Sequence, residues 1–347
     1  MNILITGGAG FIGSYFARWY LKKKKANIVV LDSLTYAGNI ANLKDCMEKE
    51  NFHFIKGEIQ DRELLDSLMS DHSFDVLVNF AAESHVDRSI IDPLSFVRTN
   101  IEGTQVLLDA ARHGGIKRLV QISTDEVYGS LGTSGRFSET SPLNPTSPYA
   151  ASKTAADHLV LASFKTFGFD TIITRCSNNY GPYQFPEKLI PLFITNAMND
   201  KQLPLFGNGE NVRSWLHVED HCTALDLVID NGRSGEVYNI GGDESFDRTN
   251  REVTSLILGS LGKPEGLISY VEDRLGHDRR YAIEAEKIER ELSWKPKISF
   301  EQGVEETVGW YLGNQEWWQA VKCREHESFF ERYYGERLRK AEASYAG

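Results

Sequence analysis

A glycine turn between an apolar strand and a helix is the feature that most constrains how this chain folds. Residues 2–6 are a short apolar run, residues 7–13 read Gly-Gly-Ala-Gly-Phe-Ile-Gly, and residues 14–21 carry apolar side chains at helical spacing. Glycines allow a tight turn and let the backbone approach a pyrophosphate, which then lies on the helix N-terminus. The pattern predicts the first unit of a dinucleotide-binding sheet.

An acidic residue at the end of the next apolar run refines this prediction. Residues 27–31 read Asn-Ile-Val-Val-Leu and are followed by Asp32. A carboxylate at this point accepts hydrogen bonds from ribose hydroxyls and repels a 2′-phosphate. Strand, glycine turn, helix, strand and terminal acid together indicate NAD as the cofactor, in preference to NADP.

Strands and helices alternate along the first half of the chain. Apolar runs predict strands at 2–6, 27–31, 52–56, 75–80, 117–123 and 170–175, with helices at about 11–24, 61–70, 93–113 and 149–167. This order predicts an α/β fold of the Rossmann type. Its doubly wound parallel sheet binds ligands beyond the carboxyl ends of the strands.

The alternation is interrupted after about residue 180, where prolines and glycines accumulate. We expect a smaller C-terminal substrate domain to begin there. Two later segments, around 215–230 and 235–242, look like a helix and a strand that return to the sheet. The predicted division is therefore a cofactor domain of 1–179 with 215–242, and a substrate domain of 180–214 with 243–347.

Composition excludes several other classes of protein. With 347 residues, 41% of them hydrophobic, the chain can bury a full core, and no apolar run reaches the length of a membrane span. A net charge of -11 disfavours nucleic-acid binding, and four widely spaced cysteines indicate no metal site. Because the first strand begins at residue 2, we expect no signal peptide and a cytoplasmic location.

Two further motifs predict acid and base chemistry. Thr124, Asp125 and Glu126 follow the strand at 117–123, and Tyr149 and Lys153 are four apart on a predicted helix. Residues at this spacing share a helix face, so we expect the ammonium to lower the phenol pKa and make a base for a sugar hydroxyl. Simple dehydrogenation does not need the two carboxylates, so they favour a dehydration.

Seven stretches of the chain resemble those of a known family: 6–13, 31–39, 81–89, 123–129, 149–153, 175–191 and 276–281. The chain resembles the extended short-chain dehydrogenases and, among them, the dTDP-glucose 4,6-dehydratases. The specific part is the pair Asp125 and Glu126, which the related epimerases and decarboxylases lack.

The resemblance implies 4,6-dehydration of dTDP-glucose with a tightly bound NAD that is regenerated in each turnover. Tyr149, held by Lys153, would deprotonate the C4 hydroxyl while hydride leaves C4, and Thr124 would bond the C4 oxygen. Glu126 would remove the C5 proton and Asp125 would protonate the departing C6 hydroxyl, before hydride returns to C6. Asp125 must then hold a proton, which requires a raised pKa.

The resemblance also implies ligand contacts over much of the chain. The residues expected at the cofactor are Gly7, Gly10, Phe11, Ile12, Gly13, Asp32, Ser33, Thr35, Glu58, Ile59, Ala81, Ala82, Thr99, Tyr149, Lys153 and Asn179. Those expected at the nucleotide sugar are Ser84, Asp87, Asn178, Glu187, Lys188, Leu189, Pro204, Phe206, Arg213, Asn250, Asp273, Arg274 and His277. Phe206 would stack on the base, and the arginines would bind the diphosphate.

Some positions depart from the family pattern and leave the substrate open. Ser214, His217 and Leu275 stand where Asp, Tyr and Pro are usual, and Glu58 replaces an Asp. A dehydratase of UDP-glucose or of a UDP-N-acetylhexosamine is therefore an alternative.

Two alternatives lie outside dehydration: a UDP-sugar C4 epimerase or decarboxylase, and a NAD-sensing scaffold without turnover. The paired acids argue against the first, and the complete catalytic set argues against the second. The resemblance also predicts a homodimer, formed through the helices at 93–113 and 149–167.

Overall fold

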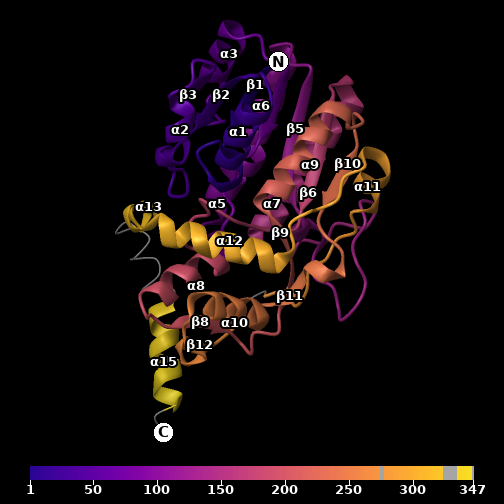
Figure 1. Ribbon diagram of the computed structural model, residues 1–347. Coiled ribbons are helices and arrows are strands. Elements are labelled where there is room, and N and C mark those ends of the chain that lie inside the picture. The colour runs from indigo at the N-terminus through magenta and orange to yellow at the C-terminus, as the bar shows by residue number, and fades with distance from the viewer. Residues whose placement is uncertain (274–276, 323–333, 346–347) are drawn as a thin grey trace.

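The apolar runs of the first half form a seven-stranded parallel sheet, in the order β10-β6-β5-β4-β1-β2-β3 (Figure 1). The computed structural model describes residues 1–273, 277–322 and 334–345. The strands of the sheet are β1 (Asn2–Thr6), β2 (Asn27–Asp32), β3 (Phe52–Lys56), β4 (Val76–Asn79), β5 (Arg118–Thr124), β6 (Thr171–Cys176) and β10 (Val237–Ile240).

Both faces of the sheet are covered by helices, because alternate side chains of a strand point to opposite faces. Ile3 and Ile5 of β1 pack in one apolar core with α1 and α9, whereas Leu4 packs in a second core with α3, α6 and α7. The helices on the two faces are α1 (Phe11–Lys23), α3 (Arg62–Asp71), α6 (Gly103–His113), α7 (Pro148–Phe167), α9 (Val218–Asn231) and α11 (Glu286–Leu292). The predicted doubly wound sheet is confirmed.

The strand order reverses between β1 and β4, since the chain runs from β1 outward to β3 and then returns to β4 on the other side. In open parallel sheets, ligands bind at such a reversal, outside the carboxyl ends of the strands. Here those ends carry Thr6, Asp32, Asn79, Thr124 and Cys176. The fold therefore fixes where a ligand site can lie.

Two of the predicted helices differ from the observed ones in where they begin or how they continue. The helix expected at 93–113 is divided into α5 (Pro93–Phe96), a π turn at Val97–Glu102 and α6. The helix expected around 215–230 begins only at Val218. The preceding residues form β9 (Val212–His217), whose backbone pairs on both sides with other strands.

A smaller part of the chain packs at the carboxyl edge of the sheet around a third apolar core (Figure 1). Its elements are β7 (Asn178–Tyr180), α8 (Leu189–Met198), β8 (Leu203–Phe206), β9, β11 (Asp247–Thr249), α10 (Asn250–Leu261), β12 (Ile268–Val271), α12 (Phe300–Gly313), α13 (Gln315–Val321) and α15 (Glu336–Tyr345). Short elements complete the chain: η1 (Ile40–Leu43), α2 (Lys44–Met47), α4 (Val86–Ile91), η3 (Asp125–Tyr128), η4 (Glu244–Phe246) and η5 (Glu265–Leu267). Among the described residues, no helix is both long enough and apolar enough to cross a membrane.

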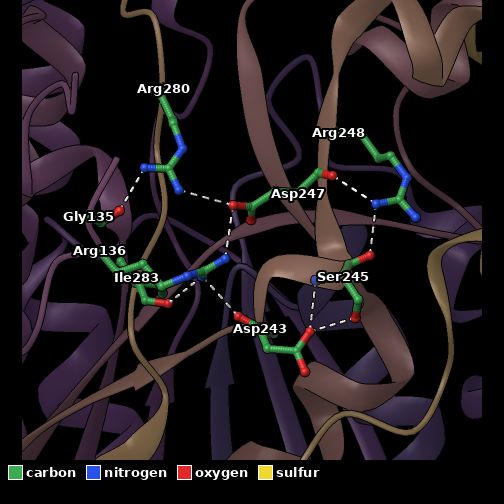
Figure 2. Close-up of polar contacts among 9 residues, drawn as sticks. Gly135, Arg136, Asp243, Ser245, Asp247, Arg248, Arg280 and Ile283 are labelled. Carbon is green, nitrogen blue, oxygen red and sulfur yellow. Dashed lines mark hydrogen bonds and ion pairs between the residues drawn. The ribbon is translucent and has the colours of Figure 1, made fainter. Parts of the chain in front are cut away.

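A pair of arginines ties the loop after the acid pair to the smaller part of the molecule. Figure 2 shows Arg136 and Arg280 converging on one carboxylate oxygen of Asp247, at 2.9 and 3.2 Å. Arg136 also donates to the backbone oxygens of Gly242 and Ile283, at 3.1 and 3.0 Å. These contacts hold three segments that are distant in sequence in one arrangement around the carboxyl edge.

A buried ion pair fixes α7 to the sheet. Arg175 of β6 donates from Nε to Oδ2 of Asp157 at 2.9 Å, and the two side chains are 3% and 0% exposed. Arg175 also donates from Nη1 to the hydroxyl of Tyr128 at 2.9 Å, and that hydroxyl bonds Asn239. The pair therefore fixes the helix that carries Tyr149 and Lys153 relative to the strand ends.

Replacing Asp157 by Asn should strongly destabilise the protein, because the Arg175 charge would stay buried without its partner. We expect the free energy of unfolding to fall by about 3–5 kcal/mol, measured by equilibrium denaturation. The control is Asp66→Asn, which breaks the exposed pair of Asp66 with Arg62 and should cost less than about 1 kcal/mol. Equal losses in the two variants would contradict the proposed importance of the buried pair.

Candidate active site

One cavity of about 630 Å³ lies at the carboxyl edge of the sheet, between the strand ends and the smaller part of the chain. All five residues predicted to be catalytic line it, as do all those predicted at the cofactor. The lining residues predicted at the nucleotide sugar are Ser84, Asp87, Asn178, Glu187, Lys188, Leu189, Pro204, Phe206, Arg213, Asn250 and His277. Asp273 instead contacts Nδ1 of His277 from outside the lining, at 2.5 Å, and Arg274 lies outside the described residues.

The glycine turn leaves one end of the cavity open to a ligand. Gly7 has φ +67°, and a Cβ there would lie 2.5 Å from the Ala81 nitrogen. Gly10 caps α1 without a side-chain hydrogen bond, so the first N–H groups of the helix have no partner within it. A Cβ on Gly10 would meet only the Gly7 oxygen, at 3.3 Å, and would project into this space. The turn therefore fits a pyrophosphate at the helix N-terminus.

Asp32 supports the glycine turn as well as lining the cavity. Its two carboxylate oxygens accept hydrogen bonds from the backbone N–H groups of Ala9 and Leu34, both at 2.8 Å. Burial raises the pKa of Asp32, and the two N–H groups oppose that shift. Each oxygen keeps a further lone pair. Asp32 can therefore accept a ribose hydroxyl while it holds the turn.

The acid pair follows β5 directly and its members have different environments. Thr124 donates from Oγ1 to Oδ1 of Asp125 at 3.3 Å, and its Oγ1 accepts the backbone N–H of Glu126 at 3.3 Å. Asp125 is 2% exposed. Burial, and next the charge of Glu126, raise the pKa of Asp125 to about 8. Asp125 therefore holds a proton at neutral pH, as the acid role requires.

The Tyr149 phenol has a pKa well above its usual range, which is opposite to the shift expected from the sequence. The main cause is burial, followed by the charge of Glu126; a hydrogen bond with Thr124 opposes them. Lys153, whose pKa is lowered by burial, donates to the Ile122 oxygen at 2.7 Å. The expectation of a lowered pKa for the Tyr149 phenol was therefore wrong. The helical spacing of Tyr149 and Lys153 does not reveal that both are buried or that the Glu126 carboxylate lies nearby.

The sequence analysis missed a group of side chains around Glu187. Oε2 of Glu187 lies 3.7 Å from Nε2 of His85 and 3.6 Å from Nε of Arg88. The Arg88 guanidinium stacks over the Tyr36 ring at 3.8 Å. Burial raises the pKa of Glu187 to about 7, while Lys188 and Arg88 lower it. His85 and Arg88 lie in the motif at 81–89, which was the available signal.

Tyr281 is a second cavity residue that the sequence analysis did not select. It lines the cavity, and the guanidinium of Arg213 stacks over its ring at 4.3 Å. Burial raises its pKa, and the charge of Glu126 adds to that effect. Tyr281 ends the motif at 276–281, from which only His277 was selected.

The positions that depart from the family pattern have different surroundings. Glu58 lines the cavity, whereas Ser214 and His217 are buried in β9. Ser214 lies opposite Asp247 in the register of β9 and β11, and its hydroxyl has no hydrogen-bond partner among the described residues. Leu275 lies outside the described residues.

Comparisons with known proteins agree with this geometry. Residues 4–307 match the family model described as GDP-mannose 4,6 dehydratase. The chain is 50% identical to a dTDP-glucose 4,6-dehydratase of Streptomyces niveus, over 93% of this chain and 96% of that protein. It is 52% identical to a low-salt glycan biosynthesis protein of Haloferax volcanii, over 91% of this chain and 100% of that protein.

A solved structure is similar over the same length. It is a dTDP-glucose 4,6-dehydratase of Streptomyces venezuelae crystallised with NAD bound, with a TM-score of 0.89 and 50% identity, and the match covers 93% of this chain and 100% of that one. The chain therefore belongs to the family of GDP-mannose 4,6 dehydratase and the dTDP-glucose 4,6-dehydratases.

Proposed function

We propose that the protein catalyses the NAD-dependent 4,6-dehydration of dTDP-glucose to dTDP-4-keto-6-deoxyglucose and water. The observation that carries this proposal is the pair of acids at the end of β5, next to a buried Tyr and Lys. Asp125 has a pKa of about 8, raised by burial and then by the charge of Glu126, so one member of the pair can donate a proton while the other accepts one. Relatives of about half identity carry the name of this activity.

The proposed cofactor is NAD, tightly bound and regenerated in each turnover. The open helix N-terminus behind Gly10 suits its pyrophosphate, and Asp32 suits its adenine ribose. When bound, NAD would accept hydride from C4 of the hexose and return it to C6. The remaining steps are proton transfers that the side chains of the chain itself can perform.

Each proton transfer is assigned to one side chain. Tyr149 takes the proton of the C4 hydroxyl in its ionised form, which burial disfavours and which the positive nicotinamide of bound NAD would favour, with Thr124 hydrogen-bonded to the C4 oxygen. Once C4 is a ketone, Glu126 removes the acidified C5 proton, and Asp125 donates its proton to the C6 oxygen as the C6–O bond breaks and water leaves. As hydride would return to C6, Glu126 gives a proton back to C5 and regains its charge. Lys153, anchored on the Ile122 oxygen, fixes the position of the helix face beside Tyr149.

We also propose a division of binding between two parts of the chain: the cofactor to 1–179 with 215–242, and the nucleotide sugar to 180–214 with 243–347. The pairing of β10 with β6 supports the return of the later segment to the sheet. Phe206 from β8 and Arg213 from β9 reach the cavity from the second part. A variant at Asp32 should weaken binding of the cofactor, and a variant at Phe206 should weaken binding of the nucleotide sugar. The division would be contradicted if both variants weakened binding of the same ligand and left binding of the other unchanged.

A homodimer through the helices at 93–113 and 149–167 is proposed on the apolar side chains exposed there. Leu94 and Val97 are 62% and 44% exposed, and Ile91 just before this segment is 67% exposed; separately, Phe167 at the end of α7 is 55% exposed. Large exposed apolar side chains grouped on a surface are typical of an interface. A sedimentation mass of one chain would contradict the dimer.

The function is tested by mass spectrometry after incubating the purified protein, without added reductant, with dTDP-glucose, UDP-glucose or UDP-N-acetylglucosamine. We expect loss of one water from dTDP-glucose alone. Water loss from a UDP-sugar would retain the chemistry and reassign the substrate, in keeping with the altered positions Ser214 and Leu275. An isomer, or carbon dioxide without water loss, would contradict dehydration.

Removing both acids should separate oxidation from water loss. In the double variant Asp125→Asn with Glu126→Gln, we expect hydride removal at C4 to continue and dehydration to stop, so that reduced cofactor accumulates on the protein and is seen by its absorbance. Tyr149→Phe is the comparison, because without the phenol the first step should fail and no reduced cofactor should form. Normal dehydration by the double variant would refute the assignment.

The raised pKa of Asp125 predicts an alkaline limit to activity. An acid catalyst must be protonated, so kcat/KM should be highest below about pH 8 and fall about tenfold per pH unit above it. Glu187 lies in the same cavity and has a pKa of about 7, so its titration must be excluded as the cause of the fall. The fall should persist in Glu187→Gln; its disappearance in that variant would assign the titration to Glu187.

A further inference from the structure

His221 is a buried histidine behind the cavity wall that none of the proposed roles uses. It lies on α9 and is 0% exposed, with Nδ1 at 2.9 Å from Oδ1 of Asn179. Asn179 lines the cavity together with its neighbours Cys176 and Ser177. Cys176 is paired with Thr124 in the register of β5 and β6. The contact of His221 with Asn179 therefore lies directly behind the strand ends that carry the acid pair.

The hydrogen bonds around Asn179 assign the proton on the His221 ring. The Asn179 Nδ2 donates at 2.9 Å to the backbone oxygen of Ser177, which can only accept. The amide oxygen must then face His221, so Nδ1 of the ring carries the hydrogen and donates to it. The Asn179 amide nitrogen is thus directed toward Ser177 in the cavity lining, and its oxygen is directed away, toward α9.

The surroundings of the other ring nitrogen, Nε2, keep the His221 imidazole uncharged. Nε2 of His221 is buried and has no hydrogen-bond partner among the residues that the structure describes. A proton on Nε2 would have no acceptor, and burial lowers the pKa of His221 to about 3. The ring is therefore a neutral donor to Asn179 over the whole physiological pH range.

We propose that His221 is a positioning residue, which holds the Asn179 amide in the orientation that receives the nicotinamide end of the cofactor. The proposal rests on the proposed function, which makes this cavity the NAD site. Without the His221 donor, the Asn179 oxygen would be left without a hydrogen bond, and the amide would rotate to find another donor. The N–H groups would then leave the cavity wall.

Two substitutions distinguish positioning from simple packing. In His221→Asn, the side-chain amide nitrogen lies about where Nδ1 was and can still donate to Asn179; in His221→Leu, a similar volume is filled without a donor. We expect the dissociation constant for NAD to rise about tenfold in His221→Leu and by less than about threefold in His221→Asn. Melting temperatures of the two variants are measured in parallel. The variant that binds NAD more weakly should not be the one with the lower melting temperature. Equal weakening in both variants, or none in either, would overturn the proposal.

A double-mutant cycle tests whether His221 acts through Asn179. Asn179→Ala alone should weaken NAD binding, and adding His221→Leu should weaken it no further. Additive losses would overturn the proposal.

The tautomer of His221 is measured in the unaltered protein. Nitrogen NMR of the histidine ring should show hydrogen on Nδ1 and none on Nε2, and the reverse tautomer would contradict the assignment.

NAD binding is measured without sugar nucleotide, so it separates this proposal from the proposed function. Absence of dehydration with intact NAD binding would reject the function and leave the positioning role standing. A wild-type protein that does not bind NAD would reject both.

Discussion

The reversal of strand order between β1 and β4 is the constraint on which the rest of the structure depends. It opens a space at the carboxyl edge of the sheet, and the smaller part of the chain closes that space from the other side. The glycine turn, Asp32, the acid pair and the N-terminal end of α7 all meet there because they follow neighbouring strands. The buried ion pair of Asp157 with Arg175 then joins α7 to β6.

Desolvation at this edge changes the proton affinity of the side chains that lie there. Asp125 and Glu126 are adjacent in sequence, yet burial, and next the charge of Glu126, raise the pKa of Asp125 to about 8. The same low-polarity surroundings raise the pKa of the Tyr149 phenol and keep the His221 ring neutral. Burial at this edge thus leaves the Asp125 carboxyl protonated and the His221 ring neutral at neutral pH.

Much of this could be predicted from short-range patterns. The strands at 2–6 and 52–56 have the predicted bounds, and the residues selected from the glycine turn and the acid motif line one cavity. Contacts between distant segments could not be predicted in this way. His85 and Arg88 meet Glu187 across about a hundred positions of sequence. Val212–His217 is a strand because it pairs with one strand that precedes it and one that follows it.

The fold class, the glycine turn and the choice of acidic and basic side chains that line the cavity could be read from the order of residues, because they follow from local spacing and side-chain chemistry. The charge and orientation of those side chains could be read only from the folded chain. A pKa depends on burial and on every nearby charge, and an amide such as that of Asn179 is oriented by partners from other elements. Neither property is contained in the order of residues within one motif.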